Sequence, residues 1–139
     1  MKKILENVNL DSIVIENNGR NINLKFIDMM KGDFVGWVEC RNTISLDYQN
    51  CFDEAEHEGF AEYVGLVSCQ VFSPGECEQW MGNEYRFGSK EDFKMKNLIL
   101  LCAAGGEVDL RIVCKEVFFN QSRFAVVDGL IGVDNETLG

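Results

Sequence analysis

The chain has 139 residues, with 23 acidic and 13 basic side chains, six cysteines and one histidine. This length suits a single domain, and a composition that is 46% hydrophobic and 26% charged is typical of a globular protein. The formal net charge of −10 argues against a nucleic-acid binder and against docking on an anionic membrane, because both need clustered Lys and Arg.

The segment after Met1 indicates a cytoplasmic protein. Its apolar stretch ends at Glu6, which is too short for the core of a signal peptide. The most apolar run, residues 97–106, is far shorter than the roughly 18 residues of a membrane span. Thiols are normally reduced in the cytoplasm, so we expect the cysteines to be free and structural rather than paired in disulfides.

The first strands are predicted by the alternation of polar and apolar residues. Residues 12–17 contain a β-branched run, and residues 21–26 alternate without a break, which places their apolar side chains on one face. Between them Asn18-Gly19 suits the two positive φ angles of a type I′ turn. This pattern predicts an antiparallel hairpin.

Two further strands are predicted at residues 34–40 and 43–48, because turn signals precede each of them. Four strands joined by short turns predict an antiparallel meander, with one face on a core and the other in water. Trp37 lies within the third strand, and we expect its large apolar ring in the core.

The region that follows breaks the strand pattern. Residues 53–58 combine helix formers with acids in a first turn, which predicts a helix of about two turns that ends at Gly59. After a strand expected at residues 63–72, residues 73–90 contain the only proline and several aromatic residues. We expect this loop to fold over the core.

The last third of the chain again shows strand patterns. The apolar run at residues 97–103 predicts a strand in the interior of the sheet, and residues 108–114 alternate with one apolar face. Residues 116–120 are expected to continue this strand past a bulge, and residues 124–127 to form a last short strand. Residues 128–139 show little periodicity, which predicts a loosely ordered tail.

No strong catalytic or metal-binding motif accompanies these elements. Cys51, Glu54 and His57 fall at a helical spacing that could present three metal ligands, but an exposed histidine in an acidic turn is the interpretation we favour. The chain shows no nucleophile elbow and no Gly-rich phosphate loop. We therefore expect no enzyme activity, no metal and no cofactor.

The most informative local feature is a run of acids without Lys or Arg between residues 53 and 62. A solvated face is one interpretation, and a negative surface that steers a basic partner is the sharper one. Aromatic residues in the following loop could cover the core or anchor a partner. The residues expected to bind the partner are Asp53, Glu54, Glu56, Glu58, Glu62, Glu76, Glu78, Trp80 and Tyr85.

The opening of the chain resembles the small bacterial YxiG-like and immunity-type domains. Those domains begin with a short His-Asp-Ser segment, followed by a hairpin and by further strands that carry an aromatic residue. Asp11-Ser12 matches the last two positions, and Leu10 stands where the family has His. Gly36-Trp37-Val38 and Ile44-Ser45-Leu46 match the later strands in character. The likeness covers residues 1–50 and implies a β-rich sheet domain and, in some relatives, a place beside a toxin gene.

Together these features predict one mainly β domain over residues 1–139, with α+β as a variant. The expected architecture is an antiparallel meander folded into a sandwich or half-barrel, with one or two short helices. The expected function is a non-catalytic, acidic interaction protein, namely an immunity-type inhibitor that occludes a basic, nuclease-like toxin. The alternative is a domain that binds a small ligand or a metal under the loop of residues 72–87.

Overall fold

The structure is a computed structural model that describes residues 1–50, 62–72 and 97–135. Ten strands in these ranges form one antiparallel sheet, which confirms the prediction of a mainly β protein. The helix expected at residues 53–58 lies outside the described residues. In chain order the elements are β1 (Lys2–Glu16), the 3₁₀ turn η1 (Asn17–Gly19), β2 (Asn21–Asp28), β3 (Phe34–Arg41), β4 (Ser45–Asn50), β5 (Glu62–Phe72), β6 (Leu98–Ala104), β7 (Val108–Cys114), β8 (Glu116–Phe119), β9 (Ser122–Val127) and β10 (Leu130–Asn135).

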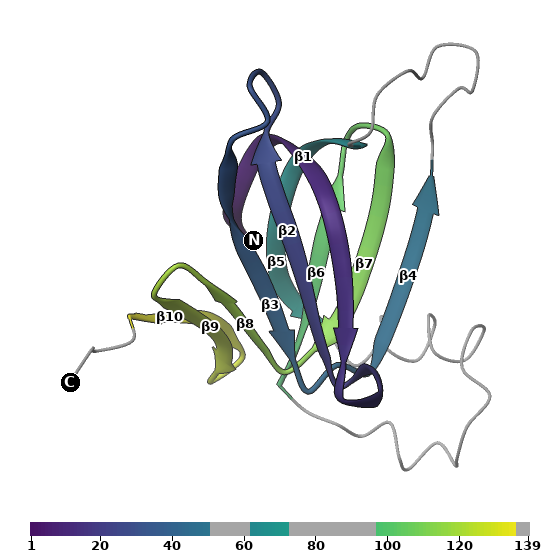
Figure 1. The fold of residues 1–139 in the computed structure, drawn as a ribbon. Coiled ribbons are helices and arrows are strands. Elements are labelled where there is room, and N and C mark those ends of the chain that lie inside the picture. The colour runs from purple at the N-terminus through teal and green to yellow at the C-terminus, as the bar shows by residue number, and fades with distance from the viewer. Residues whose placement is uncertain (51–61, 73–96, 136–139) are drawn as a thin grey trace.

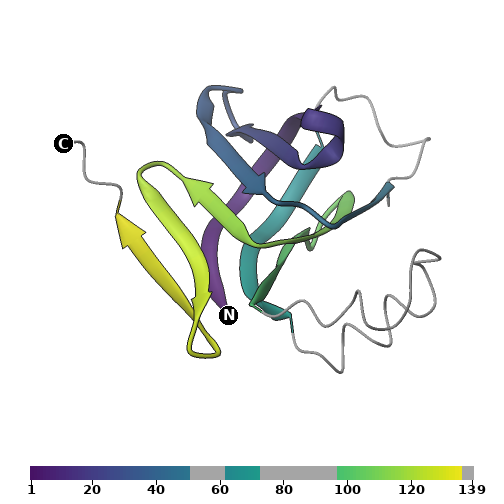
Figure 2. The ribbon, with the colours of Figure 1, turned by 90° about the horizontal axis from the view of Figure 1, so that it is seen from below.

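The sheet must curl, because a single residue links two strands that a flat sheet would hold far apart. The order across the sheet is β10-β9-β8-β3-β2-β1-β5-β6-β7-β4. Six strand spacings of about 4.8 Å, roughly 29 Å in all, would separate β8 from β7 in a flat sheet. Only Lys115 connects them, and two Cα steps span less than about 8 Å. The sheet therefore rolls up, with β1–β3 on one wall and β5–β7 on the other (Figure 1, and from one end in Figure 2).

A bent ribbon joins the two walls of the roll. In it β3 pairs with β8, and β4, the continuation of β3, pairs with β7. At the bend the N–H of Ile44 donates to the carbonyl oxygen of Val113 at 2.7 Å, and Asn42 adopts a left-handed φ of 55°. Asparagine tolerates this conformation better than most residues. The predicted meander is therefore confirmed for β1–β3 and wrong for β4, because the bend carries β4 to the opposite wall.

The first hairpin forms as predicted. Asn18 and Gly19 have φ angles of 58° and 89°, and the N–H of Arg20 donates to the carbonyl oxygen of Asn17 at 3.2 Å, which closes the turn. Strand β1 is longer than the sequence indicates. Its first half, which starts at Lys2, pairs with β5, while its second half pairs with β2.

The inner face of the roll holds the hydrophobic core. The alternation predicted in β2 is confirmed, because Ile22, Leu24 and Phe26 are all 2% exposed or less. The apolar face predicted for β7, from Val108 to Cys114, is buried in the same way. Both patterns show that the two-residue period of a strand decides which side chains enter the core.

Three thiols gather in this core. Cys40, Cys69 and Cys114 are fully buried, and they are free, as is the partly buried Cys102. Hydrogen bonding to Cys114, together with burial, raises the pKa of Cys40 well above its ordinary value of 9.0. Burial raises the pKa of Cys69 to about 12. Cys40 and Cys69 therefore keep their protons at neutral pH, and the buried thiols pack as small apolar groups.

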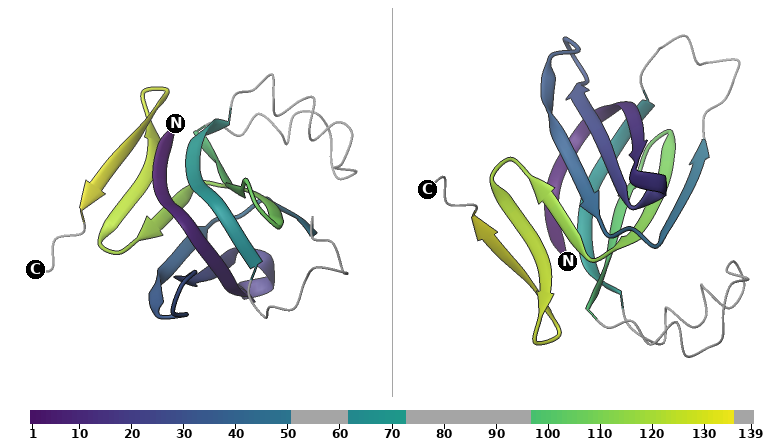
Figure 3. Two further views of the ribbon diagram at one scale, coloured as in Figure 1. Left: turned by 90° about the horizontal axis from the view of Figure 1, so that it is seen from above. Right: turned by 60° about the horizontal axis from the view of Figure 1, so that its bottom comes forward.

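The segment expected as a loose tail instead forms strand β10 over Leu130–Asn135, paired with β9. Val127 pairs with Leu130, so the loop contains only Asp128 and Gly129, both at positive φ. Asp-Gly is itself a type I′ turn sequence, and it explains why the chain turns back here. Figure 3 shows this hairpin projecting from the roll. Residues 136–139 lie outside the described residues.

Candidate binding pocket on the outer face

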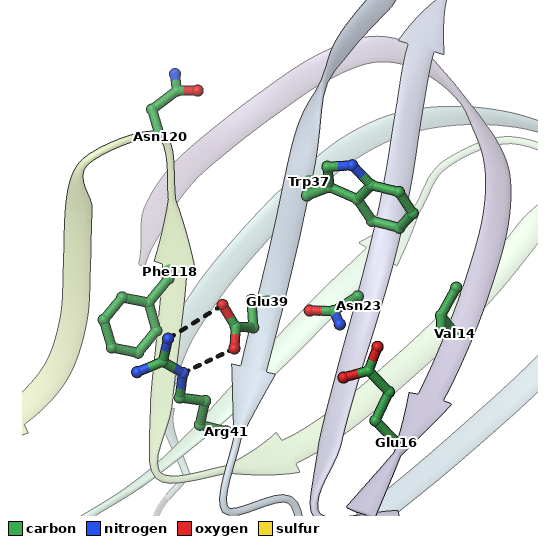
Figure 4. Close-up of a pocket in the computed structure, with 8 residues that line it drawn as sticks. All are labelled: Val14, Glu16, Asn23, Trp37, Glu39, Arg41, Phe118 and Asn120. Carbon is green, nitrogen blue, oxygen red and sulfur yellow. Dashed lines mark hydrogen bonds and ion pairs between the residues drawn. The ribbon is translucent and has the colours of Figure 1, made fainter.

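A shallow pocket of about 510 Å³ lies on the outer face of the roll, across β1, β2, β3 and β8. Cross-strand register explains which side chains meet there. Asn23 of β2 pairs with Val14 of β1 on one side and with Glu39 of β3 on the other, and Glu39 pairs in turn with Phe118 of β8. The lining residues, drawn in Figure 4, are Val14, Glu16, Asn23, Trp37, Glu39, Arg41, Phe118 and Asn120.

Trp37 stands on this outer face and is 41% exposed, so the expectation that it belongs to the core is wrong. The reason is the alternation of side chains along β3, in which Val38 and Cys40 point inward. Gly36 also belongs to the inner set. A Cβ at Gly36 would lie 2.7 Å from Cε2 of Phe119, so the absence of a side chain makes room for that ring. With Gly36 and Val38 inside, Trp37 must face solvent.

Arg41 closes one side of the pocket. Its Nε lies 2.7 Å from Oε1 of Glu39 and its Nη2 lies 3.3 Å from Oε2, which is a two-pronged ion pair. The guanidinium also stacks on Phe118, with Cζ 4.0 Å from the ring centroid. Bidentate pairing and stacking on an aromatic ring both suit the planar guanidinium. The charge of Arg41 is therefore held at the edge of the pocket by Glu39 and Phe118.

The opposite side of the pocket carries an acid without such a partner. Glu16 is exposed, and its carboxylate makes no side-chain hydrogen bond or ion pair with the described part of the chain. Lys25, the cross-strand neighbour of Trp37, forms an ion pair with Asp11 at 3.4 Å. Two carboxylates and one guanidinium line the pocket, so its formal charge is −1.

Only one of the predicted partner-binding residues falls within the described ranges. Glu62 begins β5, on the other wall of the roll, and its carboxylate accepts a hydrogen bond from the Tyr48 hydroxyl. Burial, with the hydrogen bond to Glu62, raises the pKa of Tyr48. Glu62 therefore lies apart from the pocket. The remaining eight, namely Asp53, Glu54, Glu56, Glu58, Glu76, Glu78, Trp80 and Tyr85, lie outside the described residues.

The metal ligands considered from the sequence, Cys51, Glu54 and His57, also lie outside the described residues. Within residues 1–50, 62–72 and 97–135, no group of three or more His, Cys, Asp or Glu is placed to hold a metal ion. In the same ranges, no helix has the length and apolar character that crossing a membrane requires.

The pocket was not anticipated as a site, although the sequence contains the signal for it. The alternation of β3 is visible in Gly36-Trp37-Val38-Glu39-Cys40-Arg41, where Trp37 shares its parity with a glutamate and an arginine. A tryptophan in phase with charged residues belongs to the solvent face of a strand. Glu16 and Asn23 follow from the pairing of β1, β2 and β3, whereas the contribution of Phe118 depends on the pairing of β8 with β3, which no local pattern indicates.

Residues 3–121 match the model of a protein family whose description, "-like", names no activity. Because this match spans more than half of the chain, the chain belongs to that family. All the residues that line the pocket fall within the matched range. No curated protein matches the chain.

The fold is also similar to a crystal structure of an uncharacterized protein from Neisseria gonorrhoeae. The two chains are 18% identical, and the match has a TM-score of 0.57 and covers 86% of this chain and 97% of that chain. At this identity the likeness establishes the fold alone.

Proposed function

We propose that this protein is a non-catalytic interaction protein that binds a basic protein partner through the outer face of β1, β2, β3 and β8. As an immunity-type inhibitor, it would occlude the active site of a nuclease-like toxin in the cytoplasm. The observation that carries the proposal is the exposed Trp37, which lines a pocket on the outer sheet face together with Glu16 and Glu39.

Two general properties of interfaces support this assignment. Tryptophan and arginine are enriched among the residues that dominate binding energy, and Trp37 and Arg41 lie on one face of β3 with Glu39 between them. Complementary charge raises association rates, and a chain with a net charge of −10 attracts basic proteins. The acidic run of residues 53–62 would add to this steering.

The test compares two variants of β3 in a capture experiment. Trp37→Ala removes the exposed ring in the pocket, and Phe34→Ala removes an exposed ring, 60% accessible, that does not line it. Tagged wild-type and variant proteins are incubated with lysate of the source cells, washed with rising salt and analysed by quantitative mass spectrometry. We expect a basic protein that wild type and Phe34→Ala retain, that Trp37→Ala loses at least about tenfold, and that salt releases.

Inhibition is then measured directly. The captured partner is expressed alone, and its nuclease activity is assayed with increasing amounts of wild type or of Trp37→Ala. Stoichiometric inhibition by wild type only would support the inhibitor role. A basic partner that both β3 variants retain equally would contradict the proposed surface, and a partner whose activity is unaffected would contradict the inhibitor role.

A second candidate, favoured by the size of the pocket, is the binding of a small molecule. A volume of about 510 Å³ is within the range of pockets that hold small ligands. The pocket is open on a sheet face, whereas most small-ligand sites surround their ligand, and this difference ranks the candidate second.

A further inference from the structure

We propose that the Trp37 pocket receives a cationic side chain, a lysine or an arginine, from the surface of the partner. This inference rests on the proposed function, because it names the chemical group that the partner would insert. It makes Trp37, Glu16 and Asn23 the residues that contact this group, and it gives Arg41 the role of positioning Glu39.

The first support is the aromatic ring of Trp37. The face of an indole attracts cations more strongly than the ring of any other side chain. Within the described residues, Arg41 is the one cation that stacks on an aromatic ring, and it stacks on Phe118 rather than on Trp37. The nearest lysine across the strand, Lys25, is paired with Asp11. Trp37 therefore presents its ring at the pocket without a cation from the described part of the chain.

The second support is the distribution of charge around the pocket. The guanidinium of Arg41 is already bound by both carboxylate oxygens of Glu39 and stacked on Phe118, so it is poorly placed to receive an anion. Glu16 on the opposite rim adds a further negative charge. An anionic group in the pocket would meet two carboxylates, whereas a cation would pair with Glu16 and remain close to Glu39.

The third support is the shape of the pocket. In Figure 4 the short side chain of Asn23 lies at its centre, with Trp37 above, Val14 to one side and Glu16 below. An extended aliphatic chain can lie along Val14, while its charged end lies against the face of the indole and near the amide and carboxylate oxygens. The side chains of lysine and arginine have this division into an apolar stem and a cationic end.

The experiment uses isolated side-chain probes, so it does not depend on the identity of the partner. The ¹⁵N-labelled full chain is titrated with the N-acetyl methylamides of arginine, lysine, norleucine and glutamate, and the side-chain N–H signals of Trp37 and Asn23 are followed by NMR. We expect the arginine and lysine probes to shift both signals and to bind at least about fivefold more tightly than norleucine. The glutamate probe should leave both signals unchanged. Equal shifts with norleucine, or tighter binding of glutamate, would overturn the proposal.

Matched variants test the role of each contact. Glu16→Gln removes the charge at the rim, and Asp128→Asn removes a charge from the β9–β10 turn, where asparagine also accepts a positive φ. We expect Glu16→Gln to weaken binding of both cationic probes about fivefold and Asp128→Asn to leave it unchanged. Trp37→Leu keeps an apolar side chain of moderate size, so a loss of cation preference in this variant would be due to the ring. If Glu16→Gln and Trp37→Leu bind the probes like wild type, the cation lies elsewhere.

The failure of this inference is distinguishable from the failure of the proposed function. If cationic probes do not bind but capture of a basic partner still depends on Trp37, the surface is correct and the inserted group is not cationic. If the probes bind as expected but no basic partner depends on Trp37, the cation subsite exists and the proposed function is wrong.

Discussion

The two faces of strand β3 contrast sharply. Its inner residues Val38 and Cys40 are completely buried, whereas Trp37 and Glu39, which alternate with them, lie on the outer face. Trp37 is 41% exposed, and Glu39 pairs with Asn23 of β2 and Phe118 of β8. Both sets come from one stretch of sequence and differ only in parity. The inner face is therefore expected to determine stability, and the outer face is available for binding.

The contrast also explains why the large apolar ring of Trp37 can be changed without a large loss of stability. A buried side chain is held by contacts on all sides, so its removal leaves a cavity. Trp37 is 41% exposed and lies outside the core, so its removal leaves no void there. Substitutions on the two faces should therefore separate loss of stability from loss of binding.

The largest expected effect on stability comes from removing a buried side chain from the inner face. Phe26→Ala removes a fully buried ring from β2 and should lower the free energy of unfolding by about 3–5 kcal/mol. Phe34→Ala removes a ring of the same size that is 60% exposed, and should change it by less than about 1 kcal/mol. Urea denaturation followed by circular dichroism measures both values. Similar losses for the two variants would show that the faces do not differ as described.

A smaller effect is expected at Gly36, on the inner face of β3. Gly36→Ala places a methyl group 2.7 Å from the Phe119 ring, and the ring must shift to relieve the overlap. We expect a loss of about 1–3 kcal/mol in the free energy of unfolding. Phe119→Leu shortens the clashing side chain, so Gly36→Ala should cost clearly less in the Phe119→Leu background. Equal costs in both backgrounds would place the strain elsewhere.

Some of this contrast could be predicted from the sequence, and some could not. Alternation alone identifies the buried faces of β2 and β7, and Asn18-Gly19 identifies the first hairpin. Alternation also predicts that Trp37 faces solvent, because Trp37 is in phase with Glu39 and Arg41. Its size alone favours the core, and this is why the expectation for Trp37 is wrong. Asp128-Gly129 likewise predicts the final hairpin, although the segment as a whole has little periodicity.

The pairing of strands that are distant in the sequence, by contrast, could not be predicted from local patterns. Strand β4 leaves β3 for β7, and β8 joins β3, because the whole sheet rolls up around one core. No local pattern at Asn42 or Lys115 encodes which strand lies on the other side. The pocket consequently combines residues separated by about a hundred positions, and only the tertiary structure brings Val14 and Phe118 to one site.

The buried thiols make the inner face sensitive to alkaline pH. The pKa of Cys69 is raised from 9.0 to about 12 in the folded protein, so unfolding at high pH releases a proton that the folded state retains. A group with a raised folded pKa stabilises the fold below its unfolded pKa, and this contribution is lost as pH rises from about 9 towards 12.

We therefore expect the free energy of unfolding to fall between pH 8 and pH 10.5, with a shallower slope in Cys69→Val. The pKa values of Cys40 and Cys102 are also raised, so the informative quantity is the difference in slope between the two proteins. Parallel curves that differ only by a constant offset would mean that the substitution changes packing alone and that Cys69 does not retain its proton in the folded state.

The smallest expected effect concerns Arg41, at the edge of the outer face. Arg41→Lys keeps the charge but loses the two-pronged pairing with Glu39 and the stacking on Phe118, which should cost about 0.5–1 kcal/mol of stability. Arg20→Lys, an exchange at an exposed position, should cost less. The more revealing readout is binding, because a less firmly held Glu39 becomes available to a cation in the pocket. Arg41→Lys should therefore bind the cationic probes at least as tightly as wild type despite its lower stability, whereas weaker binding would show that Arg41 itself contacts the ligand.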